Sequence, residues 1–511
     1  MRKLGFDNNK YLAMQSDHIR ERISQFGDKL YLEFGGKLFD DYHASRVLPG
    51  FEPDSKLRLL KELSDQAEIV FAISAKDIEK NKIRGDLGIT YDSDVIRLIG
   101  TYREQGLFVG SVVITQFSGQ ESALLFKNRL ENLGISVYIH YNIPGYPSNI
   151  PLIVSENGYG KNDYIETSHP LVIVTAPGPG SGKMAVCLSQ LYQEHQRGIE
   201  AGYAKFETFP IWNLPLKHPV NLAYEAATAD LNDVNMIDPY HLEAYGVTTV
   251  NYNRDVEIFP VLNTIFEKIY GSSPYKSPTD MGVNMAGNCI CDDEACREAS
   301  RQEIIRRYYV LREDPNCLKI FLHADANAKI QRIKEREQLS EKEAEKIELL
   351  MNMEGITVSD RKVAVKALER AQQTGGPAAA LELEDGRIIT GKTSNLLGAS
   401  AALLVNVLKE LAGIDHNVHI ISPEAIEPIQ KLKVDYLNSK NPRLHTDEIL
   451  IALSTSAAVN PIAELALSQL PKLKGCQAHT SVMLSSVDIK TFKKLGVQLT
   501  SEAVNERQIL S

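Results

Sequence analysis

The chain contains 511 residues, of which 43% are hydrophobic and 24% charged, and its formal net charge at pH 7 is -10. This composition is that of a folded globular protein of about three ordinary domains, and it excludes a disordered or fibrous chain. The acidic balance argues against nucleic acid as a main partner, because binding to a phosphate backbone requires an excess of lysine and arginine.

The N-terminal segment and the cysteines predict a cytoplasmic protein. The opening MRKLGFDNNKYLAM has no apolar core of the kind that a secretory signal needs. No stretch of the sequence approaches the roughly 18 uncharged apolar residues of a membrane-spanning helix, so we expect no membrane partner. The six cysteines are few for this length and predict reduced thiols.

Apolar runs in the first third of the chain predict the strands of a parallel sheet. One amphipathic helix, 122–133, lies between two of these runs, which is the order of a β-α-β crossover. The expected strands are 29–32, 69–73, 106–115, 135–141 and 171–175.

Further along, the character of the sequence changes twice. Residues 300–373 are rich in charges of both signs and predict a helical connector or subdomain. After residues 375–377, Gly-Gly-Pro, a strand with a turn, a small-residue helix over 398–411 and strands near His419 and Ile449 predict a C-terminal α/β domain. The fold class is therefore multidomain α/β, with expected domains 1–315, 316–374 and 375–511.

The segment LVIVTAPGPGSGKMAVCLSQ contains the strongest functional motif. An apolar strand leads into a glycine-rich loop, a lysine and a helix, which is the context of a phosphate-binding P-loop. Glycines let backbone N–H groups face a phosphate, the helix N-terminus adds a positive dipole and the lysine adds a full charge. The predicted phosphate-binding residues are Gly178, Gly180, Ser181, Gly182 and Lys183.

The motif departs from the usual G-x-x-x-x-G-K-[ST] pattern at two positions. Pro177 stands where the pattern has its first glycine, and Met184 stands where it has a hydroxyl residue for Mg²⁺. Metal-assisted phosphoryl transfer at this loop is therefore in question. The dinucleotide pattern G-x-G-x-x-G also fails, because Lys183 replaces its third glycine. A turn that merely needs glycines is the structural alternative, and residues 118–120, Ser-Gly-Gln, form a weaker second anion site.

A group of acids follows the loop in TADLNDVNMIDPYHLEAYG. Asp230, Asp233 and Asp238 offer the oxygen ligands that Mg²⁺ or Mn²⁺ would bind. Asp238 also ends a predicted short strand, 234–238, where a nucleotide site keeps its carboxylate. We assign Asp233, Asp238 and His241 as candidate catalytic residues; helix caps and solvated loop acids are the alternative interpretation.

Two further segments carry polar residues that suit a binding site. In EFGGKLFDDYHASRVLPGF, His43 is a fourth candidate for a catalytic base, and a purely structural histidine is the alternative. Residues 205–218, KFETFPIWNLPLKH, predict a substrate loop or lid, or else a packed Ω-loop.

The phrases YLEFGGKLFDDYHASRVLPGF, VTAPGPGSGKMAVCLSQ and YKSPTDMGVNMAG together resemble a bacterial family numbered 1846 among the domains of unknown function. The resemblance covers nearly the whole chain, and members are sometimes labelled ATP-dependent proteases or peptidases. It implies a P-loop-like or Rossmann-like N-terminal α/β region with a helical subdomain, and a C-terminal domain similar in topology to cytidine deaminases. Residues 375–511 lack the H-x-E and P-C-x-x-C zinc motifs, so deamination is not expected.

These observations favour an enzyme that binds a nucleotide or another phosphorylated small molecule, as a hydrolase or a phosphotransferase. The enzymatic interpretation includes a divalent cation, Mg²⁺ or Mn²⁺. The alternative is a non-catalytic, anion-binding or regulatory protein with a degenerate deaminase-like domain, and a third hypothesis is a scaffold without a small-molecule site. The sequence leaves homo-oligomerisation open.

Overall fold

The computed structural model describes residues 3–35, 42–84, 87–231, 233–312, 343 and 345–504. The chain divides into two compact units. The larger unit contains residues 4–225 and 232–300, and the smaller one contains residues 1–3, 226–231 and 301–511. A large part of the predicted connector, 316–374, lies outside the described residues, so the expected domain boundaries stay predictions.

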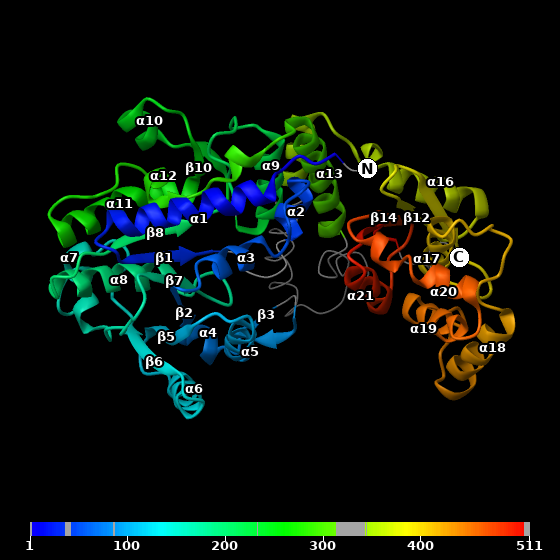
Figure 1. Cartoon of the computed structure of the whole chain (residues 1–511), viewed down its shortest axis with the longest axis horizontal. Helices are drawn as coiled ribbons and strands as arrows, with labels where there is room; N and C mark the ends of the chain where they lie inside the picture. Colours follow the sequence, from blue (N-terminus) through cyan, green and yellow to red (C-terminus); the bar gives the residue numbers. More distant parts are fainter. Residues whose placement is uncertain are drawn as a thin grey trace, which may run out of the picture. The chain divides into compact units, whose positions relative to one another are not determined.

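A seven-stranded parallel sheet forms the centre of the larger unit (Figure 1). Its spatial order is β11-β8-β1-β7-β2-β5-β6, and each neighbouring pair is parallel. All five predicted strands are confirmed, and two further strands, β8 and β11, were not predicted. The strands are β1 (Leu30–Phe34), β2 (Ala67–Ser74), β5 (Val109–Phe117), β6 (Ser136–Tyr141), β7 (Leu171–Thr175), β8 (Gly202–Phe206) and β11 (Gly282–Val283).

Helices connect these strands, because parallel neighbours require crossover connections. The predicted crossover is confirmed, since α6 joins β5 to β6 and the two strands pair in parallel. The helices are α1 (Asn8–Gln25), α2 (Tyr42–Val47), α3 (Ser55–Glu62), α4 (Ala75–Glu79), α5 (Tyr91–Glu104), α6 (Glu121–Asn132), α7 (Ile150–Ile153), α8 (Lys183–Gln196), α9 (Pro219–Ala227), α10 (Pro239–Tyr245), α11 (Asn253–Tyr270) and α12 (Pro278–Met281). Shorter elements are β3 (Ile83–Arg84) with β4 (Ile89–Thr90), β9 (Asn235–Ile237) with β10 (Val250–Tyr252), η1 (Tyr159–Lys161) and η3 (Ala286–Cys289), whereas η2 (Ala229–Leu231) belongs to the smaller unit.

The loop after β7 lies where the strand order of the sheet reverses, so that the connections of two neighbouring strands leave in opposite directions. β7 lies between β1 and β2, although the chain reaches it only after β6. The connection after β2 leads towards β5, whereas the connection after β7 leads back through α8 to β8. Neighbouring strands whose connections leave in opposite directions open a crevice at their carboxyl ends, where α/β sheets bind ligands.

A hydrophobic cluster holds α8 and α11 against one face of the sheet. Tyr31 of β1 and Tyr203 of β8 point into this cluster, together with Val172 and Val174 of β7. Each large apolar side chain that is fully buried contributes roughly 1.5–3 kcal/mol. The cluster therefore fixes the start of α8 relative to the strand ends. The helices contribute Val186, Cys187, Leu188, Leu191, Phe259, Leu262, Ile265, Phe266 and Ile269.

The smaller unit is built on a four-stranded sheet of order β13-β12-β14-β15. The predicted strand and turn form an antiparallel hairpin, and the predicted small-residue helix is α17, which packs on that hairpin. The strands are β12 (Ala378–Glu382), β13 (Ile388–Lys392), β14 (Gln477–Thr480) and β15 (Gln498–Ser501). The helical elements are α13 (Asp293–Arg312), of which residues 293–300 belong to the larger unit, η5 (Val358–Asp360), α16 (Lys362–Thr374), α17 (Ala399–Leu411), α18 (Pro423–Lys431), η6 (Leu432–Tyr436), α19 (Thr446–Ala457), α20 (Pro461–Leu467), η7 (Leu470–Leu473) and α21 (Ser486–Lys494).

Two predicted strands of the smaller unit are wrong. His419 lies in the loop between α17 and α18, and Ile449 lies inside α19. A short apolar run such as ILIAL fits a strand and a buried helix equally well. The helix forms because its first turn carries Asp447 and Glu448, and the Glu448 carboxylate accepts a hydrogen bond from the His445 N–H over 2.7 Å.

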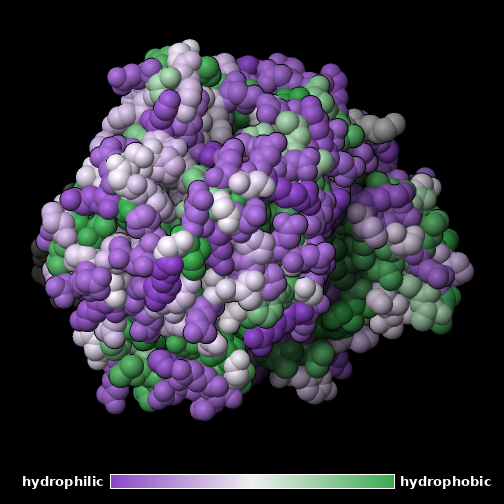
Figure 2. Space-filling model, turned by 60° about the vertical axis from the view of Figure 1, so that its left-hand side comes forward, coloured by the Kyte–Doolittle hydropathy of each residue, from purple (hydrophilic) through white to green (hydrophobic). Residues whose placement is uncertain are grey.

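The face of the molecule that Figure 2 brings forward is mainly hydrophilic, and a larger continuous group of hydrophobic side chains lies at the right of the view. The single apolar side chains elsewhere on this face are ordinary on a protein surface. Among the described residues, no helix combines the length and the apolar composition that a bilayer crossing requires.

Replacing glycines of the loop after β7 with alanine tests how tightly the loop is packed. Gly180→Ala introduces a side chain where φ is 75° and no atom lies within 4 Å. Gly182→Ala also places a side chain on a residue with a positive φ, 84°. Its Cβ would in addition lie 3.1–3.3 Å from atoms of the Thr115 side chain. We expect the free energy of unfolding to fall by about 1 kcal/mol for Gly180→Ala and by about 2 kcal/mol for Gly182→Ala.

Urea unfolding followed by the emission of Trp212, the single tryptophan of the chain, reports on the larger unit. Equal losses in the two variants would contradict the packing of Thr115 against Gly182.

Candidate functional site

The glycine-rich loop joins the carboxyl end of β7 to the first residue of α8. Gly180 and Gly182 have positive φ angles, which residues with a side chain rarely adopt. Gly178 lies so close to the Tyr91 hydroxyl that a Cβ at this position would collide with it. The glycines therefore serve the backbone geometry, a requirement that the phosphate-binding and the purely structural interpretation share.

Hydrogen bonds to its carbonyl groups hold the loop in place. Ser181 Oγ donates to the Gly178 carbonyl over 2.5 Å. From the end of β5, Thr115 Oγ1 donates to the Ser181 carbonyl over 2.7 Å, and Gln116 Nε2 donates to the Gly180 carbonyl over 3.2 Å. The carbonyl groups of the loop are thus engaged with the protein.

The N–H groups of the same segment find no acceptor within the described part of the chain. Among the residues that the structure describes, none accepts a hydrogen bond from the N–H groups of residues 180–185. Gly182 is the N-cap of α8 and provides no side-chain cap. The first N–H groups of an uncapped helix are left for water or a ligand, and the helix dipole adds about half a positive charge there.

Lys183 adds a full charge to this end of α8. Its side chain is half-buried, and it forms no ion pair with any described residue. Burial raises the pKa of the Cys187 thiol and Glu33 raises it further, whereas the Lys183 ammonium group lowers it. Met184 packs against the hydrophobic cluster instead of offering a metal ligand. The loop thus combines free amides with a cation that no described acid neutralises.

The weaker predicted anion site, residues 118–120, lies beside this loop, since Gln116 contacts Gly180. The Ser118 N–H donates to Gln120 Oε1 over 2.8 Å, so one of its amides is already satisfied. Gly119 has a φ of 98°, in keeping with a tight turn. The first loop therefore offers more unengaged N–H groups than the second.

Charged side chains gather at the carboxyl ends of β1 and β8. Lys205 Nζ lies 2.9 Å from Glu207 Oε1 and forms a second ion pair with Asp255 at the start of α11. Glu33 is the register partner of Lys205 and accepts a hydrogen bond from Tyr203 Oη over 2.7 Å. The side chains of Lys205, Glu207 and Asp255 are 23%, 6% and 15% exposed, so the cluster reaches the surface at its lysine and its aspartate.

Burial and mutual charge shift the acidities in this cluster. Burial raises the pKa of Glu207, Lys205 lowers it and Asp255 raises it, with a net increase. Burial lowers the pKa of Lys205, but Asp255, Glu207 and Glu33 outweigh that effect and raise it overall. Lys205 therefore stays charged, while Glu207 keeps a proton to higher pH than an ordinary glutamate.

Only part of this cluster was visible in the sequence. Lys205 and Glu207 were expected on a loop, but Lys205 lies in β8 and the loop begins after Phe206. Glu33 and Asp255 were missed. The strand LYLEF contains a single acid among apolar residues, which is a usable signal for Glu33. An aspartate in the first turn of a helix, as Asp255 is, carries no such signal, because acids are common there.

Asp238 caps a helix. Its Oδ1 accepts hydrogen bonds of 3.0 Å from the N–H groups of Tyr240 and His241, and its Oδ2 accepts bonds of 3.2 and 2.7 Å from the N–H and Oγ1 of Thr279. The predicted short strand before it exists as β9, but β9 pairs with β10 in a separate antiparallel ladder outside the parallel sheet. Both oxygens of Asp238 are thus fully engaged.

The other acids of this group have their own partners or lie outside the description. Asp233 forms an ion pair with Arg254 over 2.6 Å, and His241 Nδ1 lies 2.8 Å from Ser277 Oγ. The side chain of Asp230 is not among those described. Among the described residues, no group of three or more His, Cys, Asp or Glu side chains is arranged to hold a metal ion. The metal-binding and catalytic roles assigned to these residues stay predictions.

His43 lies in α2, and its ring packs edge-on against Phe209 at 5.3 Å and Tyr224 at 5.4 Å between centroids. Its sequence neighbours at 36–41 lie outside the described residues. The structure thus brings His43 beside the segment 205–218, and its role as a base stays a prediction.

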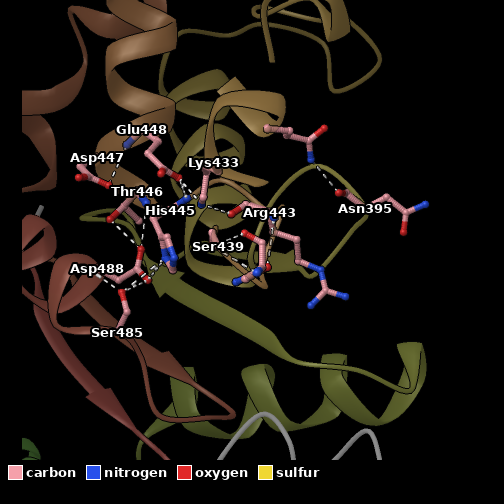
Figure 3. A network of polar contacts seen from close by, with 12 residues as sticks. Asn395, Lys433, Ser439, Arg443, His445, Thr446, Asp447, Glu448, Ser485 and Asp488 are labelled. Carbon is pink, nitrogen blue, oxygen red and sulfur yellow. Dashed lines mark hydrogen bonds and ion pairs between the residues drawn. The ribbon is translucent and has the colours of Figure 1, made fainter. Parts of the chain in front are cut away.

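The smaller unit contains a polar network that the sequence did not reveal (Figure 3). Asp488 accepts hydrogen bonds of 2.9 Å from His445 Nδ1, 2.7 Å from Ser485 Oγ, and 2.9 Å from both the N–H and Oγ1 of Thr446. Burial raises the pKa of Asp488, but these bonds outweigh it and lower the pKa to about 2. Ser485 lies on the same side of the imidazole as Asp488, so the network joins the starts of α19 and α21 and does not form a Ser-His-Asp triad.

This network predicts how the stability of α19 and α21 depends on pH. The hydrogen bond to Asp488 raises the pKa of His445 above 6.5. The stabilisation that protonated His445 provides is therefore complete below pH 6.5 and is lost as the pH rises through the folded-state pKa of His445. The lowered pKa of Asp488 acts in the opposite direction, and its contribution is lost as the pH falls from 3.8 towards 2. Hydrogen exchange of residues 446–457 and 486–494, corrected for intrinsic rates, measures both losses.

The variant His445→Gln is the control, because glutamine does not titrate. It should remove the alkaline loss of protection and retain the acidic one. An alkaline loss that persists in His445→Gln would contradict the assignment to His445.

Two family models match this chain, each along one part of it. The model described as "Domain of unknown function DUF1846, N-terminal" matches residues 4–352, and the corresponding C-terminal model matches residues 359–510. A UPF0371 protein of Streptococcus sanguinis is 58% identical over 504 residues, covering 99% of this chain and 98% of the relative. A UPF0371 protein of Corynebacterium urealyticum is 56% identical over 508 residues, with the same two coverages. The chain therefore belongs to the DUF1846 family.

Proposed function

We propose that this protein binds a phosphorylated small molecule, such as a nucleotide, at the loop 177–183, with the phosphate held by backbone N–H groups and by Lys183. The observation that carries the proposal is the hydrogen bonding of the peptide groups around the loop. The carbonyls of Gly178, Gly180 and Ser181 are engaged with the protein, while the N–H groups of residues 180–185 have no described acceptor. Such a group of amides at a helix start attracts an anion.

Several features favour phosphate over a monovalent carboxylate. Six consecutive N–H groups and one ammonium group offer more donors than the two oxygens of a carboxylate accept. A phosphate monoester has three strongly accepting oxygens and up to two negative charges. The loop also lies at the carboxyl edge of a parallel sheet, next to β2, whose connection leaves in the opposite direction.

In this proposal the loop is a degenerate P-loop. Met184 has no hydroxyl for Mg²⁺, and both oxygens of Asp238 already accept hydrogen bonds, Oδ1 from the start of α10 and Oδ2 from Thr279. A divalent cation, Mg²⁺ or Mn²⁺, would therefore arrive bound to the ligand's own phosphates. Hydrolysis or phosphoryl transfer remains the proposed enzymatic class.

A second candidate is a binding or regulatory protein without turnover, and Met184 is the observation that favours it. In that case the C-terminal unit, with the deaminase-like topology that the resemblance implies, serves architecture and not chemistry. Phosphate release from bound nucleotides and phosphoesters separates the two candidates, because turnover appears only in the enzymatic one.

Binding of pyrophosphate, measured by calorimetry, tests the proposed site. Replacement of Lys183 by alanine removes a charge-assisted hydrogen bond and should weaken binding by about 10- to 100-fold. Binding by the unchanged protein should also weaken as the salt concentration rises.

The matched control is Lys268→Ala, which removes an exposed lysine from α11 in the same unit. This variant should bind pyrophosphate as the unchanged protein does. Equal affinities for Lys183→Ala and Lys268→Ala would refute a phosphate site at the loop.

A further inference from the structure

The loop 177–183 lies at one end of a row of polar groups along the carboxyl edge of the parallel sheet. Along the sheet, β7 is followed by β1 and then by β8. Because neighbouring strands lie about 5 Å apart, the carboxyl end of β8 is on the order of 10 Å from the loop. Lys205, Glu207 and Asp255 gather at that end of β8. The side chains at both ends reach into this gap between the loop and the end of β8 and shorten it. The remaining span suits a molecule the size of a sugar phosphate.

The segment that follows β8 carries two buried donors for which the described part of the chain provides no acceptor. Trp212 Nε1 and Thr208 Oγ1 are shielded from solvent, and neither forms a hydrogen bond in the described structure. The Trp212 indole lies over Gly282, where any Cβ would collide with it, and the same position is 3.6 Å from Glu207 Oε2. Unpaired buried donors cost free energy, so they point to a bound oxygen acceptor that satisfies them.

The charged groups around Glu207 come from four elements of the larger unit. Lys205 contacts it from β8, and Asp255 faces it from α11. Glu33 of β1 raises the pKa of Lys205. Burial raises the pKa of Tyr252 of β10, and the nearby Glu207 raises the pKa of Tyr252 by a smaller amount. Three carboxyl groups share one lysine here, so retention of a proton on Glu207 relieves their repulsion.

We propose that Lys205, Glu207 and Asp255, with Trp212, bind the oxygen-bearing end of the phosphorylated ligand, and that Glu207 exchanges one proton with a ligand oxygen. The substrate class is accordingly a phosphorylated polyhydroxy compound of sugar-phosphate size. The exchange moves a single proton between the Glu207 carboxyl and the ligand and breaks no other bond. This inference rests on the proposed phosphate site, since the loop holds the other end of the ligand.

Binding of inorganic phosphate and of ribose 5-phosphate, both measured by calorimetry, tests the inference. The unchanged protein should bind ribose 5-phosphate at least about tenfold more tightly than phosphate, and only ribose 5-phosphate should shift the emission of Trp212. Glu207→Gln should lose this preference and still bind inorganic phosphate, which also shows that the variant is folded.

Calorimetry near neutral pH in two buffers of different ionisation enthalpy counts the protons that binding takes up or releases. The phosphate of the ligand titrates in both proteins, so the difference between the unchanged protein and Glu207→Gln isolates the proton of Glu207. Trp212→Phe keeps a ring over Gly282 but lacks the N–H, and it should weaken ribose 5-phosphate binding several-fold without changing the proton count.

The outcomes separate the inference from the proposal on which it rests. If phosphate binds in a manner that depends on Lys183, but ribose 5-phosphate has no advantage or Glu207→Gln exchanges the same number of protons, the inference is overturned and the phosphate site stands. If phosphate binding does not depend on Lys183, the phosphate site itself is overturned.

Discussion

The candidate site depends on the direction in which the peptide groups of residues 178–182 face. A peptide group has its C=O acceptor and its N–H donor on opposite sides, so engaging the Gly180 and Ser181 carbonyls turns the N–H groups of Ser181 and Gly182 the other way. Thr115 and Gln116 at the end of β5 provide that engagement, whereas Ser181 Oγ holds the Gly178 carbonyl, whose peptide group has no N–H because Pro179 follows. The proposed anion site rests on these two bonds, on the start of α8 and on Lys183.

The rest of the larger unit keeps this arrangement rigid. β7 is buried along its length between β1 and β2, and the hydrophobic cluster holds α8 against the same strands. Binding sites gain affinity when their donors are held in place before the ligand arrives, because less conformational entropy is lost on binding. The charged cluster around Lys205 lies on the same sheet edge, two strands away, and forms the second end of the proposed site.

Much of the fold could be predicted from the sequence, because buried parallel strands read as continuous apolar runs. LVIVT and VFAIS are of this kind, and both lie in the central sheet. β8, with the sequence GYAKF, lacks such a run because its lysine belongs to the charged cluster. The helix at Ile449 was mistaken for a strand because the short run ILIAL fits both, and the bonds from Thr446 to the distant Asp488 that also hold the helix start are not visible in the sequence.

The candidate site also contains residues that could be predicted from the sequence and residues that could not. The loop residues were predictable because glycine spacing, strand, lysine and helix are all local signals. Asp238 was assigned to chemistry because the sequence does not show that Thr279 and the start of α10 occupy its oxygens. Glu33 and Asp255 approach Lys205 only through the pairing of strands and the packing of α11, which no local pattern records.

The most direct measurement is a crystal structure of the protein with bound tungstate, an electron-dense tetrahedral anion that mimics phosphate. The account predicts tungstate at the start of α8, within hydrogen-bond distance of several N–H groups from residues 180–185 and of Lys183 Nζ. A structure in which these amides bind protein acceptors, or in which tungstate occupies other sites and leaves this loop empty, would contradict it.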